Sequence, residues 1–226
     1  MRRPISRREL LAMLGSVGLA ACDSKHPHDG FLGVMERWNK GVQSTLFRKG
    51  SSHKPGLVTP EGGFPAYFVS PSMPMAPADW TLSIKGSVAR PMELSLDDLQ
   101  KMPRTDVRIE HHCVEGWSAI ADWHGVRLRD VAEIVGAEKV GFVDFRSFDG
   151  GYWSSWDRES AFHDDTLLAY GMNGAPLGPA HGAPVRLYGS VKLGYKSVKY
   201  LNAVTFLDHE TGGYWENLGY EWYAGT

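Results

Sequence analysis

The sequence has little cysteine and no excess of charge of either sign, and both shortages narrow the classes of protein it can belong to. Only two of its 226 residues are cysteine, which excludes a disulfide-rich scaffold and any zinc or iron–sulfur site with four cysteine ligands. Lys and Arg total 24 against 26 Asp and Glu, so no basic excess points to nucleic acid. Hydrophobic residues make up 42% and charged residues 22%, which excludes a disordered chain.

The first residues are organised like an export signal. Four arginines between positions 2 and 8 precede an apolar run, 10–21, that is too short to cross a bilayer. Residues 6–11, SRRELL, resemble a twin-arginine signal, so we expect residues 1–21 to direct export by the twin-arginine machinery. Removing them lowers the 24 basic residues to 20 and the 26 acidic ones to 25, which leaves a mildly acidic mature chain.

The sequence LAAC at 19–22 resembles a lipobox, which predicts cleavage before Cys22 and acylation of that residue. An ordinary signal peptidase site without lipid is the alternative. Asp23 follows the cysteine, as in enterobacterial lipoproteins that stay at the inner membrane. We therefore expect a protein held by lipid on the periplasmic side of the bacterial inner membrane.

The remainder divides into a tether, 22–57, and a domain, 58–226. Apolar residues recur about every fourth position between Phe31 and Leu46, which predicts an amphipathic helix in the tether. In the domain, strands are predicted at 80–88, 107–113, 140–148, 185–188 and 197–207, and helices at 95–100 and 126–135. Residues 166–170 are predicted to be helical or extended. The strand–helix alternation of a doubly wound sheet is missing, so a mixed, strand-rich α+β domain is expected.

Cys113 is the cysteine whose surroundings carry chemistry. If Cys22 is acylated, Cys113 has no disulfide partner in an oxidising compartment, so it is either a buried hydrophobe or a ligand or nucleophile. At the end of the predicted strand 107–113, His111 shares its face and His112 points away. A zinc site through His111 and Cys113 lacks further ligands at metal-binding spacing. Trp117 and Trp123 could wall this region or simply belong to the core, and a solvated or salt-bridged carboxylate is the plainer interpretation of Glu115 and Asp122.

The segments CVEGWS at 113–118 and WHGVRL at 123–128 resemble the molybdenum-ligand region of the sulfite oxidase family of molybdopterin oxidoreductases. The resemblance is greatest to the branch that contains the bacterial periplasmic protein-methionine-sulfoxide reductase catalytic subunit. It continues in the same order through 165–177, 181–187, 194–200 and 213–216, and covers about residues 60–226. Several ordered motifs are more specific than a single short pattern.

The resemblance implies one molybdenum–molybdopterin cofactor per chain, with Cys113 as the protein's ligand to molybdenum. A soft thiolate suits such a metal. Ser147 stands where the reductase branch has threonine, and His181 where it has asparagine. On the residues alone, Arg186 and Lys199 could be surface cations; the ordered motifs favour contact with the cofactor's phosphate. The cofactor-binding positions implied by the resemblance are Phe68, Val69, Ser147, His181, Arg186, Ser197, Val198 and Lys199.

The implied activity is a two-electron oxygen-atom transfer, most simply the reduction of a sulfoxide-like small molecule. The chain has no CxxCH haem motif, so electrons must come from outside it, and a membrane haem or quinol partner is expected. The alternatives are a sulfite dehydrogenase-like oxidation and a non-enzymatic lipoprotein on the same fold. A monomer is expected, because no segment remains for the dimerisation domain common among sulfite oxidases.

Overall fold

The computed structural model describes residues 30–46, 56–60, 63–137 and 139–226. The expected export signal, 1–21, and the expected lipidation site, Cys22, lie outside these residues. The chain divides into two compact units, 1–46 and 47–226. In the first unit, helix α2 (Gly30–Leu46) confirms the predicted amphipathic helix, and its side chains Val34, Met35 and Trp38 are exposed. Among the described helices, none is both long enough and apolar enough to span a bilayer.

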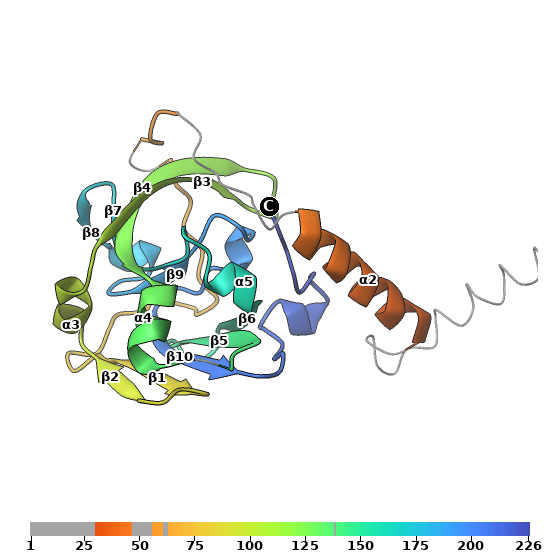
Figure 1. Ribbon diagram of the computed structural model, residues 1–226. Coiled ribbons are helices and arrows are strands. Elements are labelled where there is room, and N and C mark those ends of the chain that lie inside the picture. The colour runs from red at the N-terminus through yellow and green to blue at the C-terminus, as the bar shows by residue number, and fades with distance from the viewer. Residues whose placement is uncertain (1–29, 47–55, 61–62, 138) are drawn as a thin grey trace, which may run out of the picture. The chain divides into compact units, whose positions relative to one another are not determined.

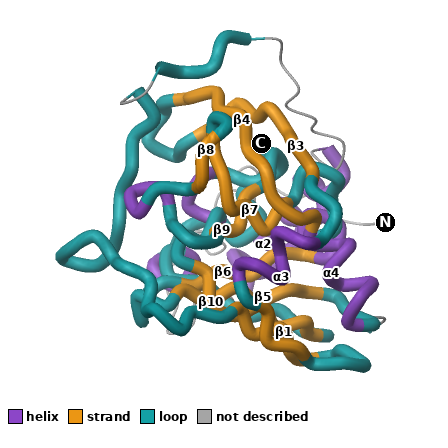
Figure 2. Tube along the Cα trace, turned by 90° about the vertical axis from the view of Figure 1, so that its left-hand side faces the viewer, coloured by secondary structure: helices purple, strands orange, loops and turns teal. Residues whose placement is uncertain are grey.

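The second unit contains two five-stranded sheets, which lie one above the other in Figure 2. The lower sheet has the order β2-β1-β10-β5-β6, in which only the pairing of β1 with the central strand β10 is parallel. Its strands are β1 (Leu82–Gly86), β2 (Met92–Leu94), β5 (Phe142–Ser147), β6 (Trp153–Asp157) and β10 (Leu201–Leu207).

The upper sheet is antiparallel throughout and has the order β3-β4-β7-β8, with β9 added to β7. Its longest pair, β3 with β4, forms the curved ribbon at the top of Figure 1. The strands are β3 (Thr105–His112), β4 (Ser118–Arg127), β7 (Leu167–Met172), β8 (Ala175–Pro176) and β9 (Arg186–Tyr188). Asn173 and Gly174, both at positive φ, form the tight turn between β7 and β8 that this dipeptide predicts.

Short helices join the sheets, and their ends follow local sequence rules. Ser95 caps α3 (Leu96–Lys101) in a capping box with Asp98, and Gly136 ends α4 (Leu128–Val135) at φ 68°. Both ends were predicted. The remaining elements are α5 (Arg158–Ala161) and the 3-10 turns η1 (Pro179–His181), η2 (Gly194–Lys196) and η3 (Glu216–Leu218).

The core consists of two apolar clusters on opposite faces of β7. The larger one fills the space between the sheets and α4, and includes Leu168. The smaller one lies against β3 and β4 and includes Leu167 and Ala169, the neighbours of Leu168 in the strand. Because β7 is buried on both faces, its sequence is a continuous apolar run rather than an alternation.

The mixed, strand-rich α+β class is confirmed, whereas several element predictions need correction. Residues 118–127 form β4, where a loop and the start of a helix were expected, and α4 begins only at Leu128. Residues 166–170 belong mainly to strand β7. The strand predicted at 197–207 begins at Leu201, because Tyr200 adopts φ 56°. The elements β2, β6 and α5 were not predicted.

Candidate active site

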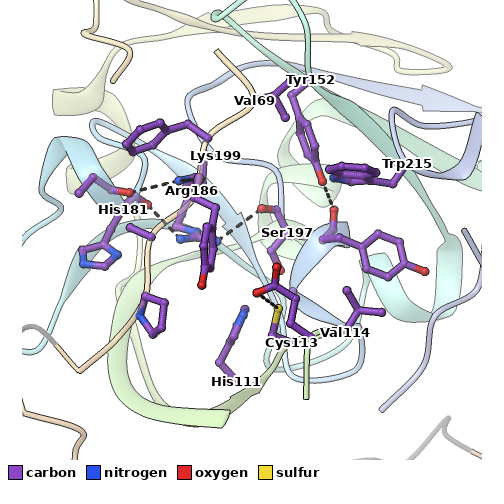
Figure 3. A pocket seen from close by; sticks show the side chains of 18 of the residues that line it. Val69, His111, Cys113, Val114, Tyr152, His181, Arg186, Ser197, Lys199 and Trp215 are labelled. Carbon is purple, nitrogen blue, oxygen red and sulfur yellow. Dashed lines mark hydrogen bonds between the residues drawn. The ribbon is translucent and has the colours of Figure 1, made fainter. Parts of the chain in front are cut away.

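A cavity of about 450 Å³ lies between the end of β3, the segment 64–69 and the loops that surround β9 and η2 (Figure 3). Seven of the nine site positions predicted in the domain line it. These are Phe68, Val69, Cys113, His181, Arg186, Ser197 and Lys199. The segments that carry them are far apart in the chain, so the fold itself assembles the site.

Cys113 follows β3 directly and stands in a tight turn. Its N–H donates to the carbonyl of Trp117 at 3.0 Å, and its own carbonyl accepts from Gly116, which has φ 87°. The thiol is half-buried and lies 3.9 Å from Oε2 of Glu115. Burial raises the pKa of the Cys113 thiol, so metal coordination would be needed to hold it as a thiolate at neutral pH.

His111 shares the cavity face with Cys113, as the strand alternation predicts, and His112 does not line the cavity. The His111 ring is buried, with Nδ1 2.8 Å from the hydroxyl of Tyr188. Burial and the positive charge of Arg186 lower the pKa of His111 to about 3, so the ring is neutral. Gly194 makes this packing possible, because a Cβ atom there would lie 2.4 Å from Nε2 of His111.

Two cations, the buried Arg186 and the half-buried Lys199, form the basic part of the cavity. The Arg186 guanidinium donates to the backbone carbonyls of His181 at 3.0 Å and Ser197 at 3.4 Å, and stacks on Trp123 and Tyr188. Lys199 Nζ donates to the carbonyls of Tyr67 and Ala180. Within the described part of the chain, no carboxylate forms an ion pair with either cation.

Burial in this cavity disfavours the charged forms of these side chains. Burial lowers the pKa of Arg186 to about 10, and burial together with Arg186 lowers the pKa of Lys199 to about 7. Burial and the same two cations also lower the pKa of His181. Carbonyl oxygens satisfy hydrogen bonds but do not neutralise charge, so an anionic ligand would stabilise this end of the cavity. The residues present therefore fit a phosphate-bearing cofactor.

Two of the predicted positions do not line the cavity. Ser147 ends β5, and its hydroxyl accepts from the N–H of Asp149, a residue that does line it. The side chain of Val198 is fully buried in the larger core cluster. A direct contact of Ser147 or Val198 with the cofactor stays a prediction. Trp117 lines the cavity, whereas Trp123 belongs to the core beneath it.

Several cavity residues escaped the sequence analysis, and most of them are aromatic. Some of them lie in the segments 194–200 and 213–216, which carry the resemblance, but no role was predicted for these individual side chains. The others come from segments without a recognisable motif. For Glu115 and Asp122, a solvated or salt-bridged carboxylate was the preferred interpretation. Asp122 is salt-bridged, with its Oδ1 2.7 Å from Nε of Arg108, whereas Glu115 lines the cavity. The unpredicted lining residues include Phe64, Tyr67, Asp149, Tyr152, Tyr195, Tyr200, Tyr214, Trp215 and Tyr220.

Two of the loops that form the cavity wall are joined by a buried ion pair. Lys196, in η2, is paired with Glu216, in η3, and Glu216 also accepts from the hydroxyl of Ser154 at 2.5 Å. The neighbours of the pair, Tyr195 and Trp215, line the cavity. The pair thus fixes the distance between two walls of the site.

The described residues contain no group of three or more His, Cys, Asp or Glu side chains that could hold a metal ion. The zinc hypothesis through His111 and Cys113 gains no further ligand from the fold. The donor set at Cys113, a single soft sulfur beside a basic cavity, instead suits a metal whose other ligands come from a bound cofactor.

Residues 68–215 match the family described as the oxidoreductase molybdopterin binding domain, and the chain belongs to this family. It is therefore a molybdopterin-binding oxidoreductase. A relative from Azospira oryzae, which carries the provisional name of a protein-methionine-sulfoxide reductase subunit, YedZ1, is 33% identical over 214 residues. That match covers 92% of this chain and 81% of the relative.

Two catalytic subunits named protein-methionine-sulfoxide reductase MsrP are also similar. The one from Campylobacter jejuni is 31% identical, covering 65% of this chain and 56% of its own, and the one from Xanthomonas axonopodis is 35% identical, covering 62% and 48%. The chain thus spans about half the length of these two relatives. The crystal structure of the sulfane dehydrogenase SoxCD from Paracoccus pantotrophus is similar in fold, with a TM-score of 0.63 at 22% sequence identity. The match covers 72% of this chain and 46% of the SoxCD chain.

Proposed function

We propose that the protein is a molybdenum–molybdopterin reductase of sulfoxide-like compounds, with one cofactor per chain. A single observation carries the proposal: one cavity combines a half-buried cysteine with a buried arginine and a half-buried lysine, and no carboxylate of the described residues pairs with either cation. The cysteine would supply the thiolate to molybdenum, and the cations would bind the phosphate of the pterin. When bound, such a cofactor supplies two-electron oxygen-atom transfer.

The remaining predicted residues would hold and orient the cofactor. Arg186 presents a planar guanidinium that suits a phosphate, and Lys199 adds a second charge. The amide of Ser197 already donates to the carbonyl of Gly194 at 3.0 Å, so its contact with the phosphate would come from the hydroxyl. Phe68 and Val69 would cover the cofactor from the segment before β1. Gly182, at φ 102°, lets η1 approach Lys199, since a Cβ atom there would lie 2.9 Å from the lysine Cβ.

The direction of the reaction rests on the relatives named methionine-sulfoxide reductases. Reduction of a sulfoxide consumes two electrons and two protons and releases a sulfide and water. We propose that the electrons come from a membrane haem or quinol partner. A twin-arginine signal at 1–21 and a lipid on Cys22 would place the protein beside such a partner, at the periplasmic face of the inner membrane.

The test combines metal content with turnover. The full chain is purified from a molybdenum-sufficient host, its molybdenum is measured by mass spectrometry, and reduction of methyl phenyl sulfoxide is followed with a reduced viologen dye. We expect about one molybdenum per chain and reduction of the sulfoxide. A folded protein with far less than one equivalent would support the non-enzymatic lipoprotein. Oxidation of sulfite with ferricyanide, without sulfoxide reduction, would support the sulfite dehydrogenase.

A further inference from the structure

The acidic side chain nearest to Cys113 has no role in the proposed function. Glu115 lines the cavity two residues after the cysteine, and its Oε2 is 3.9 Å from the thiol. The same oxygen accepts from Nε1 of Trp117 at 3.1 Å, and the negative charge of Glu115 is the main cause that raises the pKa of Tyr67. A neutral donor, the indole N–H of Trp117, therefore holds Glu115 in place.

Among the described residues, no cation forms an ion pair with Glu115, whereas Asp106 and Asp122 are each paired with an arginine. The cavity cations, Arg186 and Lys199, would meet the cofactor's phosphate if the proposed function is right. A substrate that approaches the metal ligand would then meet a net negative field from Glu115.

The entrance adds a second property. Five exposed apolar or aromatic side chains line the cavity and form what we call the apolar collar, which consists of Tyr67, Phe68, Val69, Val114 and Tyr220. Such a surface favours ligands with apolar groups over small hydrated ions. The apolar collar and Glu115 therefore both disfavour small hydrated anions.

We propose that Glu115 selects substrates by charge. At the Cys113 end of the cavity it admits neutral or cationic organic oxides and disfavours anions such as sulfite. This inference rests on the proposed function and deepens it, because it names the class of sulfoxide that is reduced. Glu115 is a specificity-determining residue here, and the oxygen-atom transfer itself does not need its carboxylate.

The first experiment measures the field at Cys113 without the cofactor. In the full chain carrying Cys22→Ser, Cys113 is the only thiol, since the sequence has two cysteines. Its alkylation rates with neutral iodoacetamide and anionic iodoacetate are compared at low ionic strength. The ratio of the two rates cancels any change in the fraction of thiolate, so it reports how the site discriminates charge.

We expect Glu115→Gln to raise the iodoacetate-to-iodoacetamide ratio about fivefold, as one unit charge at about 4 Å produces in water-like surroundings. The increase should shrink in high salt, which screens exposed charges. Glu115→Asp keeps the charge and should retain most of the discrimination. Glu133→Gln, an exposed position on α4, is the matched control and should leave the ratio unchanged.

The second experiment uses the cofactor-loaded enzyme with methyl phenyl sulfoxide and its 4-carboxylate analogue. We expect the wild type to have a lower KM for the neutral compound than for the carboxylate. In Glu115→Gln, the ratio of the two KM values should fall several-fold, and kcat for the neutral compound should change little. An unchanged alkylation ratio, or an unchanged KM preference, would overturn the charge filter. If the wild type reduces neither sulfoxide while the alkylation ratio shifts as expected, the proposed function fails and the field of Glu115 is still established.

Discussion

Lys196 and Glu216 form an ion pair in which both side chains are almost completely buried, at 0% and 4% exposure. The lysine ammonium also donates to the carbonyl of Ser155 at 2.9 Å and lies over the ring of Trp222. A buried pair of this kind adds little net stability compared with an apolar pair, but losing one partner leaves an uncompensated charge. Its importance lies in holding η2 and η3 together at the cavity wall.

We therefore expect Lys196→Met to lower the free energy of unfolding by about 3–5 kcal/mol. Urea denaturation of the cofactor-free protein measures this. Lys101→Met removes the lysine of an exposed pair with Asp97 and should leave the free energy of unfolding nearly unchanged. If Lys196→Met were as mild as this control, the pair would not hold the loops. The double variant Lys196→Met, Glu216→Leu should recover much of the loss.

Replacing Cys113 by serine separates its chemistry from its contribution to the fold. Because the side chain is only half-buried, we expect Cys113→Ser to change the free energy of unfolding by less than about 1 kcal/mol. Turnover should be lost, since a hydroxyl is a poor ligand for a metal that prefers soft sulfur. Full activity in a well-folded Cys113→Ser protein would contradict the proposed ligand role.

The two cavity cations should control how firmly the cofactor is held. Arg186→Gln and Lys199→Gln each remove a charge-assisted hydrogen bond worth about 1.5–3 kcal/mol, which predicts roughly a 10- to 150-fold weaker affinity. The pterin released on denaturation can be measured by fluorescence. Arg186→Lys should not restore binding, because lysine lacks the planar fork of arginine.

A surface arginine provides the comparison for this series. Arg104 pairs with Asp106 outside the cavity, and Arg104→Gln should leave the pterin content unchanged. Equal retention of the pterin in Arg186→Gln and Arg104→Gln would argue against the phosphate site.

The stability of the cofactor-free protein should depend on pH through Lys199. Burial and Arg186 lower its pKa to about 7, whereas an unfolded lysine titrates near pH 10.4. Between these values the unfolded chain binds more protons than the folded one, so this group makes stability rise with pH from about 7 to about 10. As pH falls through that window, the contribution is lost.

Lys199→Met removes this titration. We expect the urea midpoint of the wild type to gain more than that of Lys199→Met between pH 7 and pH 9.5. Identical slopes for the two proteins would show that Lys199 titrates normally in the folded state. Bound phosphate should raise the lysine pKa and flatten the wild-type slope.

The local part of this fold could be predicted from sequence, and the long-range part could not. The capping box at Ser95 and the glycine after Val135 are signals carried by neighbouring residues, and both helix ends were predicted correctly. Strand β4 was missed because it contains Gly125, which is typical of a turn. In the fold this glycine stands at a register shift, where a Cβ atom would lie 2.1 Å from the carbonyl oxygen of Leu168.

Strand β6 was missed for a related reason. Its two central serines look like loop residues, yet both are completely buried. Ser154 donates to Glu216 and Ser155 to the carbonyl of Gly212, so each is satisfied by a partner about 60 residues further along the chain. The sequence of the strand itself does not predict these distant hydrogen-bond partners.

In the candidate site, too, only part of the lining could be predicted from the sequence. Cys113, Arg186 and Lys199 were selected through ordered motifs, and the fold brings all three to one cavity. The aromatic wall, including Tyr152 and Trp215, depends on how loops meet, which spacing alone does not determine. Glu115 could not be assigned to the site from the sequence, because an exposed carboxylate is ordinary until its neighbours are known.

The hydrogen bond from Lys199 to the carbonyl of Tyr67 joins residues 132 positions apart, and the parallel pairing of β1 with β10 spans a similar interval. The cavity therefore has no nearly complete precursor while the chain is being synthesised, and its closure requires contacts of high sequence separation that form slowly. A cofactor can meet the finished cavity only after β10 has been made. We therefore expect loading to be a step that follows translation of the whole domain.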